Sequence, residues 1–442
     1  MEPRFADRMA PAAGRPDGKR CGMIGVDSPI SEVANGGLLS GPSLDAGAES
    51  PSAHRHRIGA LPSTSAAELI ALMEASGLQG RGGAGFPVGR KWRSVADHAS
   101  GARAVVLVNG AEGEPLSLKD RSLMASRPNL VIDGALLAAR AVGADEIIFY
   151  VGAAHRAAEA ALRHALADRS ADVRGGARLI QAPPGYVSGE ESAAVHFVET
   201  GDARPTATPP RPFERGVHGR PTLVQNVESL AVAALIARYG DAWYHGMGVG
   251  MSSGLGLLTV SGAVNRPGVQ ELALGSTVAA ASMAAGGVRG GAHAVLLGGY
   301  FGTWAGLEEA RDLRLDQPSL RARGFALGCG VVHVLGGRTC GVEASARIMS
   351  YLASQSTRQC GPCVFGLSAI AQATGRLASR SAQPGDLERI RRWSGQISGR
   401  GACRHPDGAV GMLSSALRVF GEDFAAHQQG RCVRALSMAQ VA

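Results

Sequence analysis

The stretch Gly80-Arg-Gly-Gly-Ala-Gly-Phe-Pro-Val-Gly-Arg-Lys-Trp92 decides how this chain of 442 residues is interpreted. Closely spaced glycines let a backbone approach a ligand and point its N–H groups at an anion. Arg81 and Lys91 add positive charge, so we expect the phosphate of a nucleotide or a flavin here. The run lacks the GK[ST] ending of a Walker A loop and does not leave a strand, as a dinucleotide fingerprint does. A flexible loop in a chain with 62 glycines is the alternative.

Three short strand-like runs, the first of them apolar, alternate with helix-like stretches downstream of this loop. Strands are expected at 104–108, 146–151 and 178–182, and helices from one of Ser63, Thr64 or Ser65 to about Ser76 and at 128–142 and 154–168. This alternation predicts a parallel sheet with crossover helices, which is an α/β fold.

Polar side chains follow two of these strands. Asn109 and Glu112 come after the first strand, at the end where ligands sit in open α/β sheets. Glu190 and Glu191 come after the third strand and could accept hydrogen bonds from a ribose or a ring N–H group. A solvated loop at Asn109 and acids that merely begin a helix at Glu190 stay open as alternatives.

The remaining segments differ in composition from the α/β part. Residues 1–60 are rich in Pro, Gly, Ser and Ala without an apolar period, and we expect a disordered N-terminal arm. Strands at 257–264 and 269–273, joined by a turn at Asn265-Arg-Pro-Gly268, precede a helix at 277–285. Helical patterns at 341–353, 364–380, 385–398 and 409–425 predict a C-terminal helical bundle.

Three cysteines are placed to hold a metal. Cys360-Gly-Pro-Cys363 is a C-x2-C pair, and Cys403 follows 40 residues after Cys363. Such a pair can be redox-active, bind zinc or hold an iron–sulfur cluster. Zinc could take His405 as its fourth ligand, and three unrelated thiols are the remaining alternative.

Composition excludes several classes of protein. The net charge is +8, but the basic residues are scattered and aromatic residues are only 5%, so no nucleic-acid partner is expected. No apolar run reaches about 20 residues and no signal peptide is visible, so no direct membrane insertion is expected. Seven cysteines, an odd number, argue against a disulfide framework. We therefore expect a cytoplasmic protein, free or peripheral to a membrane complex.

Taken in order, these motifs resemble those of the NADH-binding flavoprotein subunit of respiratory complex I and the related subunits of NAD-linked hydrogenases and formate dehydrogenases. The resemblance covers about residues 60–425 and rests on Gly80–Trp92, Asn109, Glu112, Glu114, Pro115, Lys119, Asp120, Arg121, Tyr186, Gly189, Glu190, Glu191, Gly219, Pro221, Thr222, Asn226, Val227, Glu228 and the Val260–Gly268 segment. It implies a Rossmann-like FMN-binding domain over 61–240, a small β-grasp (soluble-ligand-binding) domain over 250–335, and a helical bundle over 340–430 with a [4Fe–4S] cluster.

The resemblance also implies the residues of the site. Those around FMN or the nicotinamide nucleotide would be Gly80, Arg81, Gly82, Phe86, Lys91, Asn109, Glu112, Tyr186, Gly189, Glu190, Glu191 and Asn226. Among them we expect Glu112 and Glu190 to be catalytic. Cys360, Cys363 and Cys403 would bind the cluster.

This chain departs from the family pattern at both sites. Thr357 stands where the family has the first cysteine of C-x2-C-x2-C, so His405, Cys340, Cys432, water or another chain would complete the cluster, unless it is labile or absent. Ser94 and Arg211 replace two aromatic residues of the NADH site, while Phe86 is retained. Each lost ring would weaken NADH binding by ~1–3 kcal/mol.

The resemblance therefore implies an electron-transfer flavoprotein. Electrons would pass from a two-electron donor, with NAD(P)H the candidate, through FMN to the cluster and on to a one-electron partner such as ferredoxin. A non-catalytic binding scaffold and a flavoprotein with structural zinc in place of the cluster are the two alternatives.

Overall fold

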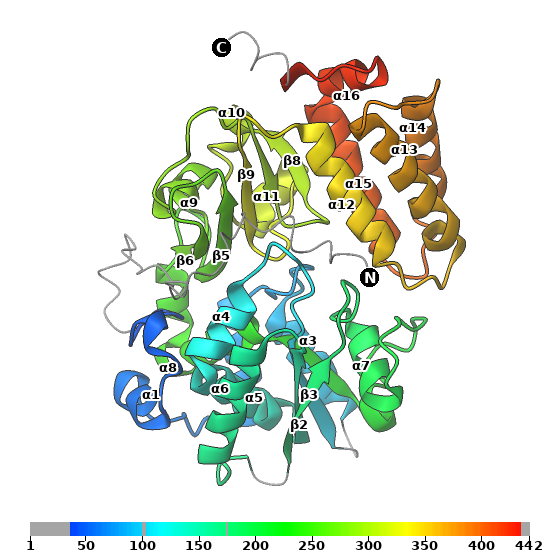
Figure 1. Cartoon of the computed structure of the whole chain (residues 1–442). Coiled ribbons are helices and arrows are strands. Elements are labelled where there is room, and N and C mark those ends of the chain that lie inside the picture. The colour runs from blue at the N-terminus through cyan, green and yellow to red at the C-terminus, as the bar shows by residue number, and fades with distance from the viewer. Residues whose placement is uncertain (1–35, 100–102, 174–175, 435–442) are drawn as a thin grey trace.

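The computed structural model describes residues 36–99, 103–173 and 176–434, and three units follow one another along the chain (Figure 1). The first is an α/β unit with η2 (Leu44–Ala46), α1 (Pro51–Ile58), α2 (Ala66–Ser76), α3 (Val88–His98), β1 (Ala104–Gly110), α4 (Lys119–Ser126), α5 (Pro128–Val142), β2 (Ala144–Gly152), α6 (Arg156–Asp168), β3 (Ala177–Ala182), α7 (Glu191–Thr200), η3 (Val217–Gly219), β4 (Thr222–Asn226) and α8 (Val227–Gly246).

The sheet of this unit is parallel throughout, in the order β3-β2-β1-β4. Central strand β1 is buried because its run of Ala and Val side chains faces helices on both sides. Helix α2 begins at a capping box, in which Ser65 and Glu68 exchange hydrogen bonds. Helices α5 and α8 pack so closely that a Cβ at Gly134 would lie 2.1 Å from the Leu230 carbonyl oxygen.

The second unit is a mixed sheet in the order β6-β5-β9-β7-β8 with short helices. Its elements are β5 (Leu255–Gly262), β6 (Gly268–Ala273), α9 (Val278–Ala284), β7 (Ala294–Leu297), β8 (Thr303–Gly306), α10 (Leu307–Ala310), α11 (Gln317–Ala322) and β9 (Val331–Leu335). The third unit is helical, with α12 (Gly341–Ser354), the π-helical turn η4 (Pro362–Leu367), α13 (Ser368–Ala378), α14 (Asp386–Ile397), α15 (His405–Val419) and α16 (Gly421–Gln428). The predicted α/β fold class with a helical C-terminal region is confirmed.

The prediction of a disordered arm over residues 1–60 is wrong from residue 36 onward; residues 1–35 lie outside the described part. The backbone N–H groups of Leu38 and Leu39 donate to the Glu271 carboxylate of β6, and Arg127 donates to the Leu39 carbonyl. In α1, His54 Nε2 lies 2.8 Å from the buried Asp133 carboxylate. Long-range polar contacts, and not an apolar period, therefore anchor this segment.

The predicted single helix at 409–425 is two helices, α15 and α16. Phe420 leaves the helical conformation between them (φ −110°, ψ 27°), and its ring packs edge-on against Trp304 of β8. None of the helices in the described ranges is long and apolar enough to cross a membrane.

Candidate functional site

A cavity of about 440 Å³ lies at the carboxyl end of the parallel sheet and is bordered by all three units. The paired strands β1 and β4 deliver Asn109 and Asn226 there side by side. Eight of the twelve residues predicted around FMN or the nucleotide line it: Arg81, Gly82, Asn109, Glu112, Tyr186, Gly189, Glu190 and Asn226. Gly80, Phe86, Lys91 and Glu191 are not in its lining. A larger cavity of about 600 Å³, between α1, α5 and the start of β2, contains none of the predicted residues.

The glycine loop closes on itself between α2 and α3. The Gly80 N–H donates to the Phe86 carbonyl at 2.9 Å, which fixes the ends of the turn. Gly83 has φ +112°, and an added Cβ there would meet no described atom within 4 Å. The loop therefore presents bare backbone to the cavity, which is the arrangement expected for binding a phosphate or a flavin ring.

Arg81 directs its guanidinium group into the protein. Its Nη2 donates to Tyr244 Oη at 3.1 Å and to the Leu255 carbonyl at 3.2 Å, and its Nε lies 3.8 Å from the Glu228 carboxylate. The Arg81 charge is thus held by groups of α8 and β5. The expectation that Arg81 supplies charge to a ligand phosphate is not met by this geometry.

A buried charge network continues from Glu228. Lys119 Nζ lies 2.8 Å from Glu228 and 2.6 Å from Asp120. Burial lowers the pKa of Lys119, but the two carboxylates outweigh burial and raise it above its usual value. Asn226 donates to Asp120 at 2.7 Å and caps α8 by accepting from the Glu228 N–H. The network fixes the floor of the cavity between β1 and β4.

Glu112 holds the segment that follows β1. Its carboxylate accepts from Ser117 Oγ at 2.7 Å, the Asp120 N–H at 2.8 Å and Arg121 Nε at 2.7 Å. Burial raises the pKa of Glu112, but Arg121 and Lys119 outweigh burial and keep it below its usual value. Glu112 also has a positive φ of 40°, a strained conformation that these bonds maintain.

Glu114 lies in one of the family motifs but was not among the predicted site residues. Its carboxyl group is buried, accepts from Tyr186 Oη at 2.9 Å and from the Tyr300 N–H at 2.8 Å, and so joins the first unit to the second. Burial raises the pKa of Glu114 to about 7. Phe301, Cys329 and the glycines at 298, 302 and 328 complete this wall. The pair of glycines at 298–299, which follows an apolar run, is the sequence signal that could have predicted the second unit's contribution to this cavity wall.

Glu190 and Lys91 also bond within the protein. The Glu190 side chain caps α7 by accepting from the Ser192 and Ala193 N–H groups through Oε2. The Lys91 ammonium pairs with Glu191, and both side chains are partly exposed. Phe86 of the glycine loop is half exposed.

Cys403 brings the helical unit to the same cavity, together with Arg404 and His405. The His405 Nε2 lies 2.8 Å from the Leu352 carbonyl, which can only accept, so Nε2 carries the proton. Nδ1 is then an unprotonated acceptor, buried and without a hydrogen-bond partner among the residues that the structure describes. A buried polar atom without a hydrogen-bond partner in a cavity wall is typical of a site where a ligand binds.

The other two predicted ligands lie at the start of η4. Burial, the largest effect, raises the pKa of the Cys363 thiol to about 11, whereas the neighbouring Ser356 hydroxyl acts to lower it. Thr357, at the altered ligand position, instead donates to the Gln359 side chain at 3.1 Å and is half-buried. Ser356, and not Thr357, is therefore beside the thiols.

Comparison with known proteins matches all three units. Residues 73–234 match the family described as the Nuo51 FMN-binding domain, residues 343–427 the NADH-ubiquinone oxidoreductase-F iron-sulfur binding region, and residues 257–299 the SLBB domain. An NADH-quinone oxidoreductase F subunit of Rhizobium meliloti is 33% identical over 83% of this chain and 90% of its own length. The corresponding protein of Rhodobacter capsulatus is 32% identical over 80% of this chain and 86% of its own length.

A solved structure agrees with these matches. A chain of an NAD⁺-reducing [NiFe]-hydrogenase in the air-oxidised state superposes with a TM-score of 0.77 at 30% identity. The match covers 88% of the present chain and 66% of the hydrogenase chain.

Proposed function

Because this chain belongs to the family of NADH-quinone oxidoreductase F subunits, an oxidoreductase family with an FMN-binding domain and an iron–sulfur binding region, we propose that it oxidises NADH and passes single electrons to a protein partner. One observation carries this proposal: Cys403 lines the same cavity as the glycine loop. A flavin in that cavity and a cluster on Cys403 would be neighbours, which electron transfer between them requires.

The cavity fits FMN on two counts. An added Cβ at Gly83 would meet nothing within 4 Å and one at Gly82 would meet only the Asn226 side chain, at 3.4 Å. His405 Nδ1 is buried without a partner in the described part of the chain. FMN supplies the exchange between a two-electron donor and one-electron carriers. Asn109, Tyr186 and Asn226 would contact it. Lys91, which is partly exposed beside Glu191, is our candidate cation for its phosphate, because the Arg81 guanidinium is directed into the protein.

We assign positioning roles to Glu112 and Glu190, for which catalytic roles were expected. Glu112 fixes the 112–121 segment, and Glu190 fixes the start of α7. Both oxygens of Glu112 already accept from N–H and O–H groups of the protein, and Oε2 of Glu190 is held by three such groups at the start of α7. Hydride transfer between a nicotinamide and a flavin needs no base at this place.

The donor set at Cys360, Cys363 and Cys403 fits three ligands of an iron–sulfur cluster. Ser356 is our candidate for the fourth position, because its hydroxyl already bonds Cys363 while Thr357 faces Gln359. Zinc at this place is disfavoured. A single tetrahedral zinc needs its donor atoms about 4 Å apart, and the described residues gather no three donors within 4.8 Å here.

The partner would be a ferredoxin or another electron-transfer protein. Phe365 lies two residues after Cys363 in η4 and is 75% exposed, and Val364 beside it is 39% exposed. Apolar side chains exposed this close to a cluster ligand favour a protein contact there. The named relatives are subunits of larger oxidoreductases, which supports the same conclusion.

Stopped-flow reduction of the flavin tests the donor. We expect NADH to bleach the flavin of anaerobically purified protein faster than NADPH does, with reduced ferredoxin as the third reagent. Reduction by ferredoxin alone would reject NADH as the substrate. Protein that retains neither flavin nor iron would support the binding-scaffold alternative.

A further inference from the structure

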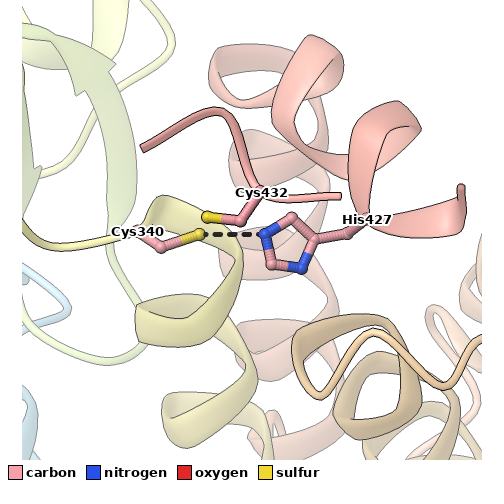
Figure 2. Close-up of side chains that lie close together, drawn as sticks. All are labelled: Cys340, His427 and Cys432. Carbon is pink, nitrogen blue, oxygen red and sulfur yellow. Dashed lines mark hydrogen bonds between the residues drawn. The ribbon is translucent and has the colours of Figure 1, made fainter. Parts of the chain in front are cut away.

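Three buried metal-ligand side chains meet at a second place in the helical unit (Figure 2). Cys340 directly precedes α12, His427 lies in α16, and Cys432 follows α16. Their donor atoms all lie within 4.8 Å of one another. Cys340 is 4% exposed, His427 is fully buried and Cys432 is 6% exposed. No other such group occurs within the described ranges of the chain.

The orientation of His427 suits a metal ligand. Its Nδ1 lies 2.9 Å from the Leu377 carbonyl, so Nδ1 carries the proton and donates. Nε2 is therefore the unprotonated nitrogen, and it points at the Cys340 sulfur at 3.3 Å, as the dashed line in Figure 2 shows. Metal-bound histidines almost always donate their other N–H to a carbonyl or carboxylate in this way.

Cys340 lies at the N-terminus of a helix. It is the N-cap residue of α12, although its side chain makes no capping hydrogen bond, and burial raises the pKa of its thiol to about 11. Helix N-termini stabilise negative charge. Figure 2 shows the Cys432 sulfur beside both the Cys340 sulfur and the imidazole. Two sulfurs and one nitrogen thus converge on one point.

We propose that Cys340, His427 and Cys432 bind one Zn²⁺ ion, separate from the iron–sulfur cluster. Zinc prefers a mixed set of thiolates and imidazole and takes tetrahedral geometry, so a water molecule fills the fourth position. Binding transfers the two thiol protons to solvent and leaves two thiolates and a neutral imidazole on the ion. No electron transfer is involved.

The ion would have a structural role. Cys340 ends the connection from the second unit into α12, whereas His427 and Cys432 belong to the last described helix and the segment after it. Ligands 87 and 92 positions apart in the sequence would be fixed to one another. Metal binding by residues so far apart contributes to folding stability, because the site does not exist in the unfolded chain.

Metal content and zinc X-ray absorption of the full-length protein, purified anaerobically with its flavin and iron, test the proposal. We expect about one zinc per chain, with two sulfur neighbours at about 2.3 Å and one nitrogen at about 2.0 Å. Less than a tenth of a zinc per chain in protein prepared with zinc present would overturn it. So would a mass lower by two hydrogens at a Cys340–Cys432 disulfide.

Matched variants separate this site from the cluster. Cys432→Ser and His427→Gln should lose the zinc and keep the iron, whereas Cys360→Ser should lose iron and keep the zinc. Cys329→Ser, a cysteine outside both sets, should keep both metals. Zinc retained at the wild-type level in folded Cys432→Ser protein contradicts the assignment. Should that variant not fold, stripping zinc from the wild type with a chelator must expose two further thiols to alkylation, and unchanged thiol reactivity overturns the proposal.

Discussion

The phenol of Tyr186 donates a 2.9 Å hydrogen bond to Oε2 of Glu114, and the same oxygen accepts from the Tyr300 N–H at 2.8 Å. Tyr186 comes from the segment before α7, Glu114 from the segment after β1, and Tyr300 from the second unit. A single buried carboxyl group therefore joins three parts of the cavity wall. Burial raises its pKa to about 7, so its charge state changes near neutral pH.

Glu114→Gln should change how stability depends on pH. The folded protein keeps the Glu114 proton up to about pH 7, whereas the unfolded chain releases it near 4.5. The free energy of unfolding therefore falls as pH rises between these values, by at most roughly 3 kcal/mol from this group. In the Glu114→Gln variant, the free energy of unfolding should fall less over this pH range than it does in the wild type. Urea unfolding of flavin-free protein at pH 5 and pH 7.5 measures it.

The exposed residue Glu309 provides the control for Glu114. Glu309→Gln should leave the pH dependence of unfolding as it is in the wild type. If the free energy of unfolding of Glu114→Gln falls with pH as much as that of the wild type, a group other than Glu114 causes the fall. Asp120, whose burial also raises its pKa to about 7, is then the next candidate.

Lys91→Ala should weaken flavin binding about tenfold, because a charge-assisted hydrogen bond to phosphate contributes roughly 1.5 kcal/mol or more. Fluorescence titration of flavin-free protein with FMN measures the dissociation constant. Arg93→Ala is the matched control, since Arg93 lies on the same helix and pairs with Glu74 at the surface. Equal FMN affinity in the Lys91 variant and the wild type would remove Lys91 from the site.

Ser356→Ala should lower the iron content of anaerobically purified protein, and Thr357→Ala should not. The reason is that the Ser356 hydroxyl acts on the Cys363 thiol and lowers its pKa, while Thr357 donates to Gln359. Thr357→Cys should restore iron to the Ser356→Ala protein by supplying a thiolate at the neighbouring position. Iron and acid-labile sulfide analysis measures all three. Loss of iron from Thr357→Ala alone would reverse the assignment.

Phe86→Ala should raise the KM for NADH about tenfold and leave the FMN content unchanged. Phe86 is 51% exposed at the glycine loop and is the aromatic residue retained there, and a stacked ring contributes ~1–3 kcal/mol. Steady-state kinetics with an artificial electron acceptor measures the change. Met283→Ala, an exposed apolar residue of the second unit, should have no effect. Unchanged KM in the Phe86 variant would place the nicotinamide elsewhere.

The sequence predicted the parallel sheet well because its signals are local. The runs at 104–108 and 147–151 are apolar, and the helix at 128–142 was predicted with its observed bounds. Residues 36–58 were missed because their anchors are distant: Leu38 bonds Glu271, 233 positions away. Such a contact leaves no periodic pattern in either segment.

The sequence predicted the site residues that lie at the ends of strands. It was less informative about residues whose role depends on the direction of their side chains. Asn109 and Asn226 converge because parallel strands end at one edge of the sheet. The charge of Arg81 does not indicate the direction of its side chain, which points inward to Tyr244. The Cys340–His427–Cys432 group has no regular spacing, so only the fold brings it together.

Low-temperature electron paramagnetic resonance of the anaerobically purified protein, before and after adding NADH, tests the central claim most directly. The proposed function predicts one FMN per chain, bound iron and sulfide, and a reduced-cluster signal that appears only after NADH is added. A flavin that NADH bleaches in iron-free protein, with no such signal, would contradict electron transfer to Cys360, Cys363 and Cys403.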